Sequence, residues 1–391
     1  MQNIAYLYIQ TEDELNRYSQ HLIDHADINW IAIDTEFVRT DTYFAELSLV
    51  QIQDNLGEVA IIDPLAIQEN GQLTGLIDLL IQPDLLKVFH SARQDIEVLY
   101  QLAHKMPVSI FDTQLAAIFF KHGDIAGFAR VVEAELNHKL DKTQTRTNWH
   151  ARPLTEEQIQ YAIDDVHYLA PLYEKFIHNL SPEQKAAIQH DCDALLNETL
   201  YRPDPASAGE KVKGVRNFKP KQLAIVHALA EWRERFAIEH NQPKKWVMSD
   251  EVIIGIAKRP PQVVEALYKV PNVKSSSVRD FGDQWIECID KVFASSPDSW
   301  PQPEPKPEPI SPQEDVLVGL CMSFCQQVAH DYHINLHNLI HKSELLKMIR
   351  TPESDALSGW RKLLVEAPLR SVLSGESCLQ IEQGKLQLKR H

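Results

Sequence analysis

The feature that most constrains the fold is a short, mostly apolar run, residues 31–37, with the sequence IAIDTEF. It follows a turn-like segment, and its alternation of apolar with small or polar residues predicts a β-strand. Because residues i and i+2 of a strand point to the same face, we expect Asp34 and Glu36 to project side by side. Two adjacent carboxylates hinder each other's ionisation, and Mg²⁺ or Mn²⁺ relieves that conflict because both ions prefer oxygen ligands. The alternative is a pair of exposed acids at a strand end.

The size and composition of the chain indicate a globular protein with more than one domain. A length of 391 residues suggests two or three domains, and 44% hydrophobic with 24% charged residues is ordinary for such proteins. No apolar run approaches the roughly 18 residues that a membrane span requires, and the first residues do not resemble a signal peptide. The five cysteines lack the spacing of a zinc site, so we expect reduced thiols and a cytoplasmic location.

The acidic balance of the chain limits how it can bind nucleic acid. A net charge of −16 argues against indiscriminate coating of nucleic acid, but it leaves room for a local basic surface. Residues 210–246 hold nine Lys or Arg against four acids, a local excess of five positive charges. This segment favours a surface that faces a polyanion, with ordinary solvated charges on helices and loops as the alternative.

The order of the predicted elements indicates an α/β fold. Three strands joined by short loops, at 30–37, 46–53 and 59–63, are expected to form an antiparallel meander after a first strand at 4–9. Further along, the pattern changes to a helix, a strand at 86–90 and a second helix. A strand that is separated from the meander by a helix is expected to pair in parallel through a crossover. We therefore predict a mixed sheet flanked by helices.

One further acid lies at a predicted strand-to-helix junction. Asp95 falls in the first turn of the helix after the strand 86–90, where the helix dipole favours a negative charge. That position alone would explain it as an ordinary acid at a helix N-terminus. In an α/β fold, however, sites gather at the C-terminal ends of strands, where both Asp34 and Asp95 are expected. Asp112, by contrast, is predicted only to cap the next helix.

The helix predicted over residues 156–178 places a tyrosine and an acid on one face. A capping box formed by Thr155 and Gln158 opens this helix. Tyr161 and Asp165 are four residues apart and therefore lie side by side. Together they can hold a water molecule, which becomes a nucleophile when a metal ion is close. Both residue types are also common on exposed helices, so the pair gains weight only from the other acids.

The loop before this helix is basic and contains an aromatic residue. Residues 139–152 hold four Lys or Arg and one Trp. This combination suits a nucleic-acid strand, because the ring can stack on bases while the cations contact phosphates. The alternative is a loop that packs against the protein through its Trp. The candidate substrate-binding residues are Lys142, Arg146, Trp149 and Arg152.

The acids and the tyrosine occur in an order that resembles a known superfamily. The succession of D-x-E from Asp34, H-x4-D ending at Asp95 and Y-x3-D ending at Asp165 is similar to that of the DEDD superfamily of 3′→5′ exonucleases. Tyr161 matches the tyrosine-containing branch, because the histidine branch would have a His at the position of Gln160. The flanking sequences IDTEFVRT, QTRTNW and ARPLT resemble the ribonuclease D family, and the resemblance covers about residues 25–180.

This resemblance implies a fold, a site and a reaction. The implied fold is RNase H-like, which agrees with the predicted order of elements. Asp34, Glu36, Asp95 and Asp165 would bind two divalent ions, Mg²⁺ or Mn²⁺, and Tyr161 would orient the attacking water. The implied reaction is hydrolysis of phosphodiesters from the 3′ end of structured RNA, tRNA precursors in particular, with release of 5′-mononucleotides. Two rivals stay open: a DNA exonuclease on the same site, and a nucleic-acid-binding protein without catalysis.

The resemblance also divides the chain. A catalytic domain is expected over 1–195 and, after a linker at 196–213, a helical HRDC domain over 214–294, of the kind shared by ribonuclease D and some helicases. A proline-rich linker at 295–312 leads to a second, divergent HRDC-like domain at 313–391. Both helical domains lack clusters of acids, so we expect them to hold RNA and to carry out no chemistry. No obligate protein partner is evident.

Overall fold

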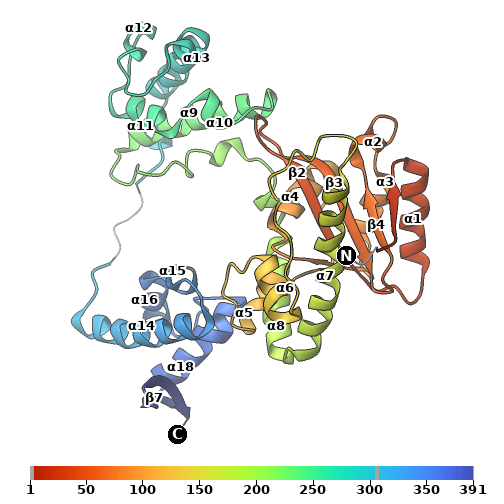
Figure 1. The fold of residues 1–391 in the computed structure, drawn as a ribbon. Coiled ribbons are helices and arrows are strands. Elements are labelled where there is room, and N and C mark those ends of the chain that lie inside the picture. Colours follow the sequence, from red (N-terminus) through yellow and green to blue (C-terminus); the bar gives the residue numbers. More distant parts are fainter. Residues whose placement is uncertain (1–3, 304–307, 391) are drawn as a thin grey trace. The chain divides into compact units, whose positions relative to one another are not determined.

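The computed structural model of the protein describes residues 4–303 and 308–390 (Figure 1). The chain forms two compact units. The first contains the chain up to Val38, Leu47–Leu200 and the chain from Pro309 onward, and the second contains Arg39–Glu46 and Tyr201–Glu308. Residues 304–307, inside the predicted proline-rich linker, lie outside the described residues. Within the two described ranges, no helix is both long and apolar enough to span a membrane.

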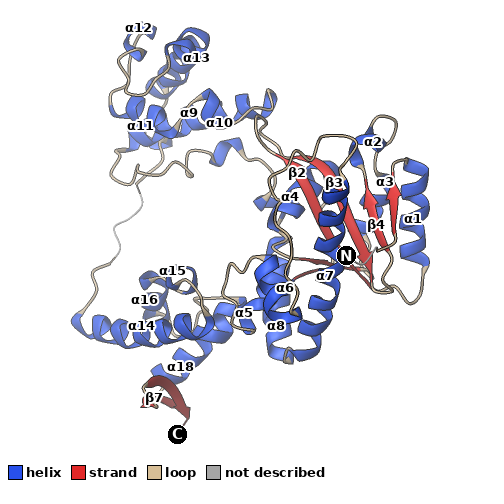
Figure 2. Ribbon diagram, viewed as in Figure 1, coloured by secondary structure: helices blue, strands red, loops and turns tan. Residues whose placement is uncertain are grey.

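A six-stranded sheet forms the centre of the first unit (Figure 2). The strands are β1 Tyr6–Ile9, β2 Trp30–Val38, β3 Glu46–Asp54, β4 Val59–Ile62, β5 Leu86–Phe89 and β6 Ile110–Asp112. They lie in the order β1-β4-β3-β2-β5-β6, with β3 antiparallel to β4. The pairs β1–β4, β2–β5 and β5–β6 are parallel. The mixed sheet and the parallel pairing of the strand after the crossover are therefore confirmed.

Helices flank this sheet, as predicted. They are α1 Glu12–Asp24, α2 Pro64–Gln68, α3 Thr74–Ile81, α4 Arg93–Ala103, α5 Thr113–Phe119, α6 Phe128–Leu136, α7 Glu156–Asn179 and α8 Pro182–Leu195, followed by the short 3-10 turn η1 Glu198–Leu200. The capping box expected at Thr155 is present, and a second one opens α1 at Thr11. The helix α8 was not predicted, because it buries only Ile188 and Cys192 and so has too weak an apolar period.

Aromatic packing fixes the position of α7 on the sheet. The ring of Tyr173 contacts Trp30 of β2 and Phe111 of β6, with ring centroids 5.0 Å and 5.1 Å apart. All three side chains are buried. Such edge-to-face pairs contribute about 0.5–1.5 kcal/mol each beyond the area that they bury. Because Asp165 lies two turns before Tyr173 on the same helix, this packing also sets where Asp165 meets β2.

The C-terminal residues of the first unit form a small helical segment and a hairpin. They comprise α14 Pro312–Tyr332, α15 Leu336–Leu339, α16 Lys342–Arg350, α17 Gly359–Arg361, the π-helical turn η4 Lys362–Glu366, α18 Ala367–Leu373, β7 Ser377–Glu382 and β8 Lys385–Arg390. Their core includes Phe324 and Leu345 and also takes in Ile118 from α5. The backbone N–H of Trp360 donates to Asp191 of α8 at 2.8 Å. This C-terminal segment (residues 309–390) therefore packs directly on α5 and α8.

The second unit is helical. It comprises η2 Pro205–Ser207, α9 Pro220–Glu239, α10 Lys244–Val247, α11 Asp250–Lys258, α12 Val264–Leu267, α13 Ser275–Ala294 and η3 Pro297–Ser299. Its core centres on Leu229, Ile253 and Trp285, and two residues of the predicted linker, Ala208 and Val212, also belong to it. A long helix, a four-residue helix and a nine-residue helix follow one another both in α9–α11 and in α14–α16. This repeated succession fits two related helical modules, which stays a prediction.

Candidate active site

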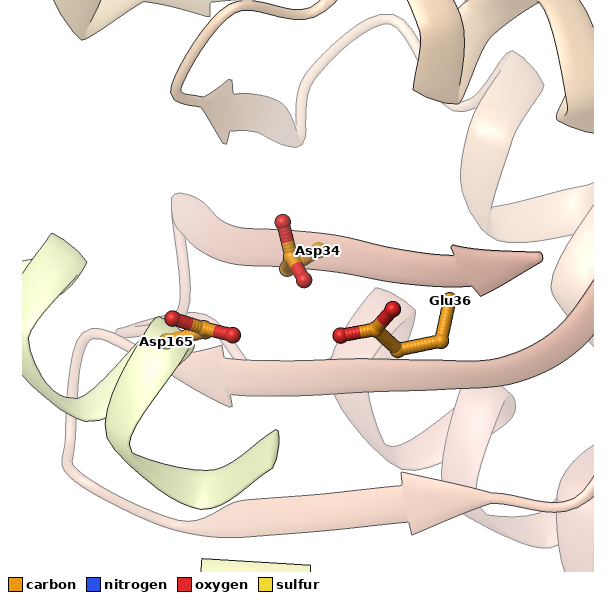
Figure 3. A group of neighbouring side chains, drawn as sticks. All are labelled: Asp34, Glu36 and Asp165. Atoms are coloured by element: carbon orange, nitrogen blue, oxygen red, sulfur yellow. The ribbon is translucent and has the colours of Figure 1, made fainter. Parts of the chain in front are cut away.

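Three carboxylates from two elements converge near the C-terminal end of β2. Asp34 and Glu36 project from β2, and Asp165 reaches toward them from α7 (Figure 3). One oxygen of each carboxylate lies within 4.8 Å of the other two. The neighbouring Asp164 has a different partner, because it accepts a hydrogen bond from Gln160 at 2.8 Å. The geometry therefore separates the two adjacent aspartates and places Asp165 in the cluster.

Asp95 lies beside this cluster, in the first turn of α4. Its Oδ1 accepts a hydrogen bond from the Thr35 hydroxyl at 2.6 Å, and the side chain is buried. Thr35 stands between the two acids of β2, so this bond ties the start of α4 to the strand. A cavity of about 230 Å³ is lined by all five predicted catalytic residues: Asp34, Glu36, Asp95, Tyr161 and Asp165.

The clustered acids make one another harder to ionise. Burial, and then the neighbouring carboxylates, raise the pKa of Glu36 to about 10. Burial is also the main cause that raises the pKa of Asp165 to about 8, although a hydrogen bond with Tyr161 opposes the shift. The pKa values of Asp34 and Asp95 lie well above their usual range, first because of burial and then because of nearby acids. The cluster therefore needs protons or cations to offset its charge.

The donor set fits a hard divalent cation. The converging ligand atoms all belong to carboxylates, which is the chemistry that Mg²⁺ and Mn²⁺ prefer. A cation would take the place of the protons that the raised pKa values retain, and it would remove the repulsion between the acids. Asp34, Glu36 and Asp165 are placed to hold such an ion, with Asp95 beside them.

Tyr161 lies one turn before Asp165 on α7 and faces the same cavity. Burial, and then the charge of Asp165, raise the pKa of its hydroxyl, so the hydroxyl keeps its proton at neutral pH. Its ring packs against Trp149, with ring centroids 5.9 Å apart. A protonated hydroxyl held at this place can bind a water molecule next to the acids.

Asp112 shapes the turn that leads into Asp95, a role beyond the helix cap predicted for it. Its two carboxylate oxygens accept hydrogen bonds from the backbone N–H groups of Ser91 at 2.8 Å and Ala92 at 2.9 Å. It also caps α5 through Gln114, so the predicted cap is confirmed. Ser91 has a φ of 66°, a left-handed conformation that costs a non-glycine residue roughly 1–2 kcal/mol. The two hydrogen bonds that Asp112 accepts from this turn offset that cost.

The four predicted substrate-binding residues fall into two pairs. Lys142 and Arg146 are exposed on the loop before α7. Trp149 is only 2% exposed, which leaves no ring face open to a base. Arg152 donates from Nε and Nη2 to both oxygens of Asp63 at 2.6 and 2.8 Å. Its further donors reach the backbone carbonyls of Ser48, Trp149 and Ala151.

Comparison with known sequences identifies relatives along most of the chain. Residues 6–181 match the sequence model of the 3′–5′ exonuclease family, and residues 222–289 match that of the HRDC domain. Ribonuclease D of Zymomonas mobilis is 33% identical over 366 residues, which span 92% of this chain and 93% of that protein. Ribonuclease D of Pseudomonas paraeruginosa is 32% identical, over 85% of this chain and 89% of that protein.

Comparison with solved structures agrees with this result. RNase D of Escherichia coli, described as an exoribonuclease involved in structured RNA processing, matches with a TM-score of 0.80 at 28% identity, over 95% of this chain and 99% of that chain. The catalytic core of RRP6 from Trypanosoma brucei shares the fold, with a TM-score of 0.53 at 23% identity, over 75% of this chain and 81% of that chain. The chain belongs to the ribonuclease D family of 3′→5′ exoribonucleases.

Proposed function

We propose that the protein hydrolyses the 3′-terminal phosphodiester of structured RNA, with two divalent ions on four acids and a water oriented by Tyr161. The proposed ligands are Asp34, Glu36, Asp95 and Asp165. The observation that carries the proposal is the convergence of three of these carboxylates within 4.8 Å. Such a group of acids costs free energy unless cations neutralise it. Mg²⁺ or Mn²⁺ is the proposed ion, because the donors are all oxygens.

The reaction is an in-line displacement at phosphorus. When bound, the divalent ions stabilise the negative charge that develops on the phosphate and on the attacking and leaving oxygens. The strand β2 and the helix α7 hold the acids in place before the RNA arrives, so little rearrangement is needed during the reaction. The Tyr161 hydroxyl binds the water and aligns it with the bond to be broken. As the new P–O bond forms, the bond to the 3′ oxygen of the preceding nucleotide breaks. A 5′-mononucleotide leaves, and the shortened RNA ends in a 3′ hydroxyl.

The proposed substrate class is structured RNA with an accessible 3′ end, including tRNA precursors. The E. coli relative is described as acting in structured RNA processing, which supports this choice. Lys142 and Arg146 are exposed on the loop before α7 and can contact phosphates. In the second unit, Lys211, Lys213 and Arg216 are exposed near the HRDC segment. A cytoplasmic site of action fits the five cysteines, all of which are free thiols.

The first test uses a 5′-labelled RNA duplex with a 3′ overhang, incubated with Mg²⁺, with Mn²⁺ or with EDTA. We expect a ladder that shortens from the 3′ end with either metal and no ladder with EDTA. Asp34→Ala is the matched inactive control, because it removes a central ligand of the cluster. An equal ladder with EDTA, or an active Asp34→Ala variant, would rule out the proposed metal-dependent site.

A parallel test separates the substrate classes. The DNA strand of the same sequence differs only in lacking the 2′-hydroxyls and in carrying thymine in place of uracil. Unequal rates on a strand without uracil or thymine therefore report recognition of the ribose. We expect faster hydrolysis of RNA, and trimming of a tRNA with an extended 3′ end down to its folded part. Faster hydrolysis of DNA would favour the DNA exonuclease reading. Tight binding of both polymers without hydrolysis would favour a binding protein.

A further inference from the structure

His90 forms part of the wall of the catalytic cavity without belonging to the acid cluster. It is the first residue after β5, and both its ring and that of Phe128 line the cavity, with ring centroids 5.3 Å apart. Its Nε2 lies 2.8 Å from the carbonyl oxygen of Ala126, and its Nδ1 lies 2.9 Å from the hydroxyl of Thr113. Because a carbonyl can only accept, Nε2 carries a proton and donates to it. These two contacts hold the ring in one orientation.

The carbonyl that orients His90 belongs to the connection between α5 and α6, residues 120–127, which we call the pocket loop. The side-chain amide of Gln114 donates to the same Ala126 oxygen at 3.1 Å. Directly after the loop, Phe128 begins α6 and lines the cavity. The conformation of the pocket loop therefore sets the position of two wall residues at once.

The pocket loop is fastened to the C-terminal segment. The Asp124 carboxylate accepts a hydrogen bond from the backbone N–H of Asn335 at 3.1 Å and another from the side-chain amide of Asn338 at 2.6 Å. Gly123 has a φ of +91°, and a Cβ added there would lie 2.5 Å from the carbonyl oxygen of His333. A glycine is therefore needed at this point of contact. Asn335 itself caps the start of α15, so its N–H is presented by a defined turn.

We propose that Asp124 is a positioning residue for RNA hydrolysis: it ties the pocket loop to the C-terminal segment and so fixes Ala126, His90 and Phe128. The C-terminal segment then serves the chemical step as well as any binding of RNA. The inference rests on the proposed function, because the wall in question borders the cavity where the RNA 3′ end reacts. A shift of about 1 Å in the reacting group can cost on the order of 100-fold in rate. The acids come from β2, α4 and α7, so their grouping does not depend on the pocket loop.

The test compares two variants of the full chain. Each removes one carboxylate that accepts hydrogen bonds from the C-terminal segment, one in the pocket loop and one on α8. Asp124→Ala releases the pocket loop, whereas Asp191→Ala removes the bond to the Trp360 N–H, away from the cavity. For Asp124→Ala we expect kcat to fall roughly 10- to 100-fold, while the Mg²⁺ concentration for half-maximal activity stays unchanged. Asp191→Ala is expected to keep the wild-type kcat. Asp124→Asn retains one acceptor oxygen and should recover part of the loss.

A double-mutant cycle then asks whether Asp124 acts through His90. If it does, adding Asp124→Ala to His90→Ala lowers kcat little further, because the two changes interrupt one chain of contacts. Losses that simply multiply would overturn the proposal, as would an unchanged kcat in Asp124→Ala or equal losses in Asp124→Ala and Asp191→Ala. If Asp124→Ala does not fold, Asn338→Ala removes the partner from the other side. Metal-dependent hydrolysis by the unmodified protein and its loss in Asp34→Ala test the proposed function separately.

Discussion

Removal of the Tyr161 hydroxyl is expected to affect catalysis and to leave RNA binding unchanged. Tyr161→Phe deletes that oxygen and leaves the ring packed on Trp149. We expect kcat to fall by about 10²-fold or more, the range typical for loss of a positioned group that handles a reacting proton. KM for RNA should stay near the wild-type value, because the cavity keeps its shape. Steady-state kinetics on labelled RNA measure both quantities.

The matched control for this change is Tyr168→Phe on the same helix. The ring of Tyr168 stacks on His138, and its hydroxyl pairs with that imidazole at 3.3 Å, outside the lining of the cavity. Its removal should leave kcat unchanged. Full activity in Tyr161→Phe would show that the hydroxyl does not orient the water.

The raised pKa values of the acids predict how stability depends on pH and metal. The pKa is about 10 for Glu36 and about 8 for Asp165, both far above the usual value near 4. Between the usual carboxyl pKa and these raised values, the folded, metal-free protein binds more protons than the unfolded chain. The stability of the metal-free protein therefore falls as pH rises through this range. Added Mg²⁺ should therefore raise the melting temperature more at pH 8 than at pH 5. Thermal melts with EDTA and with Mg²⁺ across this range measure the effect.

Asp165→Asn should remove part of the pH dependence of the metal-free protein's stability. The amide cannot ionise, so the EDTA-treated variant is expected to melt at a higher temperature than the wild type at pH 8, while hydrolysis is abolished. Each 1 kcal/mol of stabilisation corresponds to roughly 2–4 °C in a domain of 150–250 residues and to a smaller shift in a larger one. A lower melting temperature for the metal-free variant would mean that the acids do not repel one another in the folded state.

At the scale of elements, Arg152 anchors the loop before α7 to the sheet through Asp63 and Ser48. Its guanidinium pairs with Asp63, whose side chain is 1% exposed. Arg152→Ala leaves that buried carboxylate with neutral donors, the Tyr8 hydroxyl at 3.0 Å and the Ala66 N–H at 3.3 Å, and without a cation, so we expect a loss of about 3 kcal/mol in unfolding free energy. Arg235→Ala removes an exposed pair on α9 and should cost only about 0.3–0.5 kcal/mol. Urea unfolding of both variants measures the difference. Weaker RNA binding without lost stability would instead support direct contact of Arg152 with substrate.

Local elements with strong signals could be predicted from the sequence. The strand β2 and the capping box at Thr155 lie where the apolar period and the cap residues indicate. The strand β6 has three residues, too few to display an alternation. The pairing of Asp34 with Glu36 follows from strand geometry alone, because their spacing is local.

Contacts between distant segments could not be predicted in this way. The hydrogen bonds that the turn at Ser91 donates to Asp112 join residues about twenty positions apart, and they exist because β5 and β6 pair. The burial of Trp149 likewise depends on its packing against Tyr161, which a loop sequence rich in basic residues does not reveal. The order of motifs identified the acids, whereas the residues that hold those acids in place required the fold.

At the scale of the whole molecule, the net charge of −16 opposes the approach of RNA. Several cations of the basic segment 210–246 are also committed within the protein, since Arg233 pairs with Asp250 and Lys244 with Glu234. RNA must therefore be drawn by local groups that stay exposed. Lys142 and Arg146 meet this requirement on the loop before α7.

The salt dependence of RNA binding should therefore be concentrated in a few exposed residues. If Lys142 contacts a phosphate, Lys142→Ala should reduce the slope of log K against log salt by about 1 and weaken binding to all sequences alike. Lys105 is the matched control, because it is also exposed but follows the end of α4, about 16 Å along the helix from the cavity at its start. Fluorescence anisotropy titrations at several salt concentrations, with Ca²⁺ in place of Mg²⁺ to slow hydrolysis, give both slopes. An equal change in Lys142→Ala and Lys105→Ala would mean that RNA responds to the overall charge of the protein, whereas a change confined to Lys142→Ala places the phosphate path along the loop before α7.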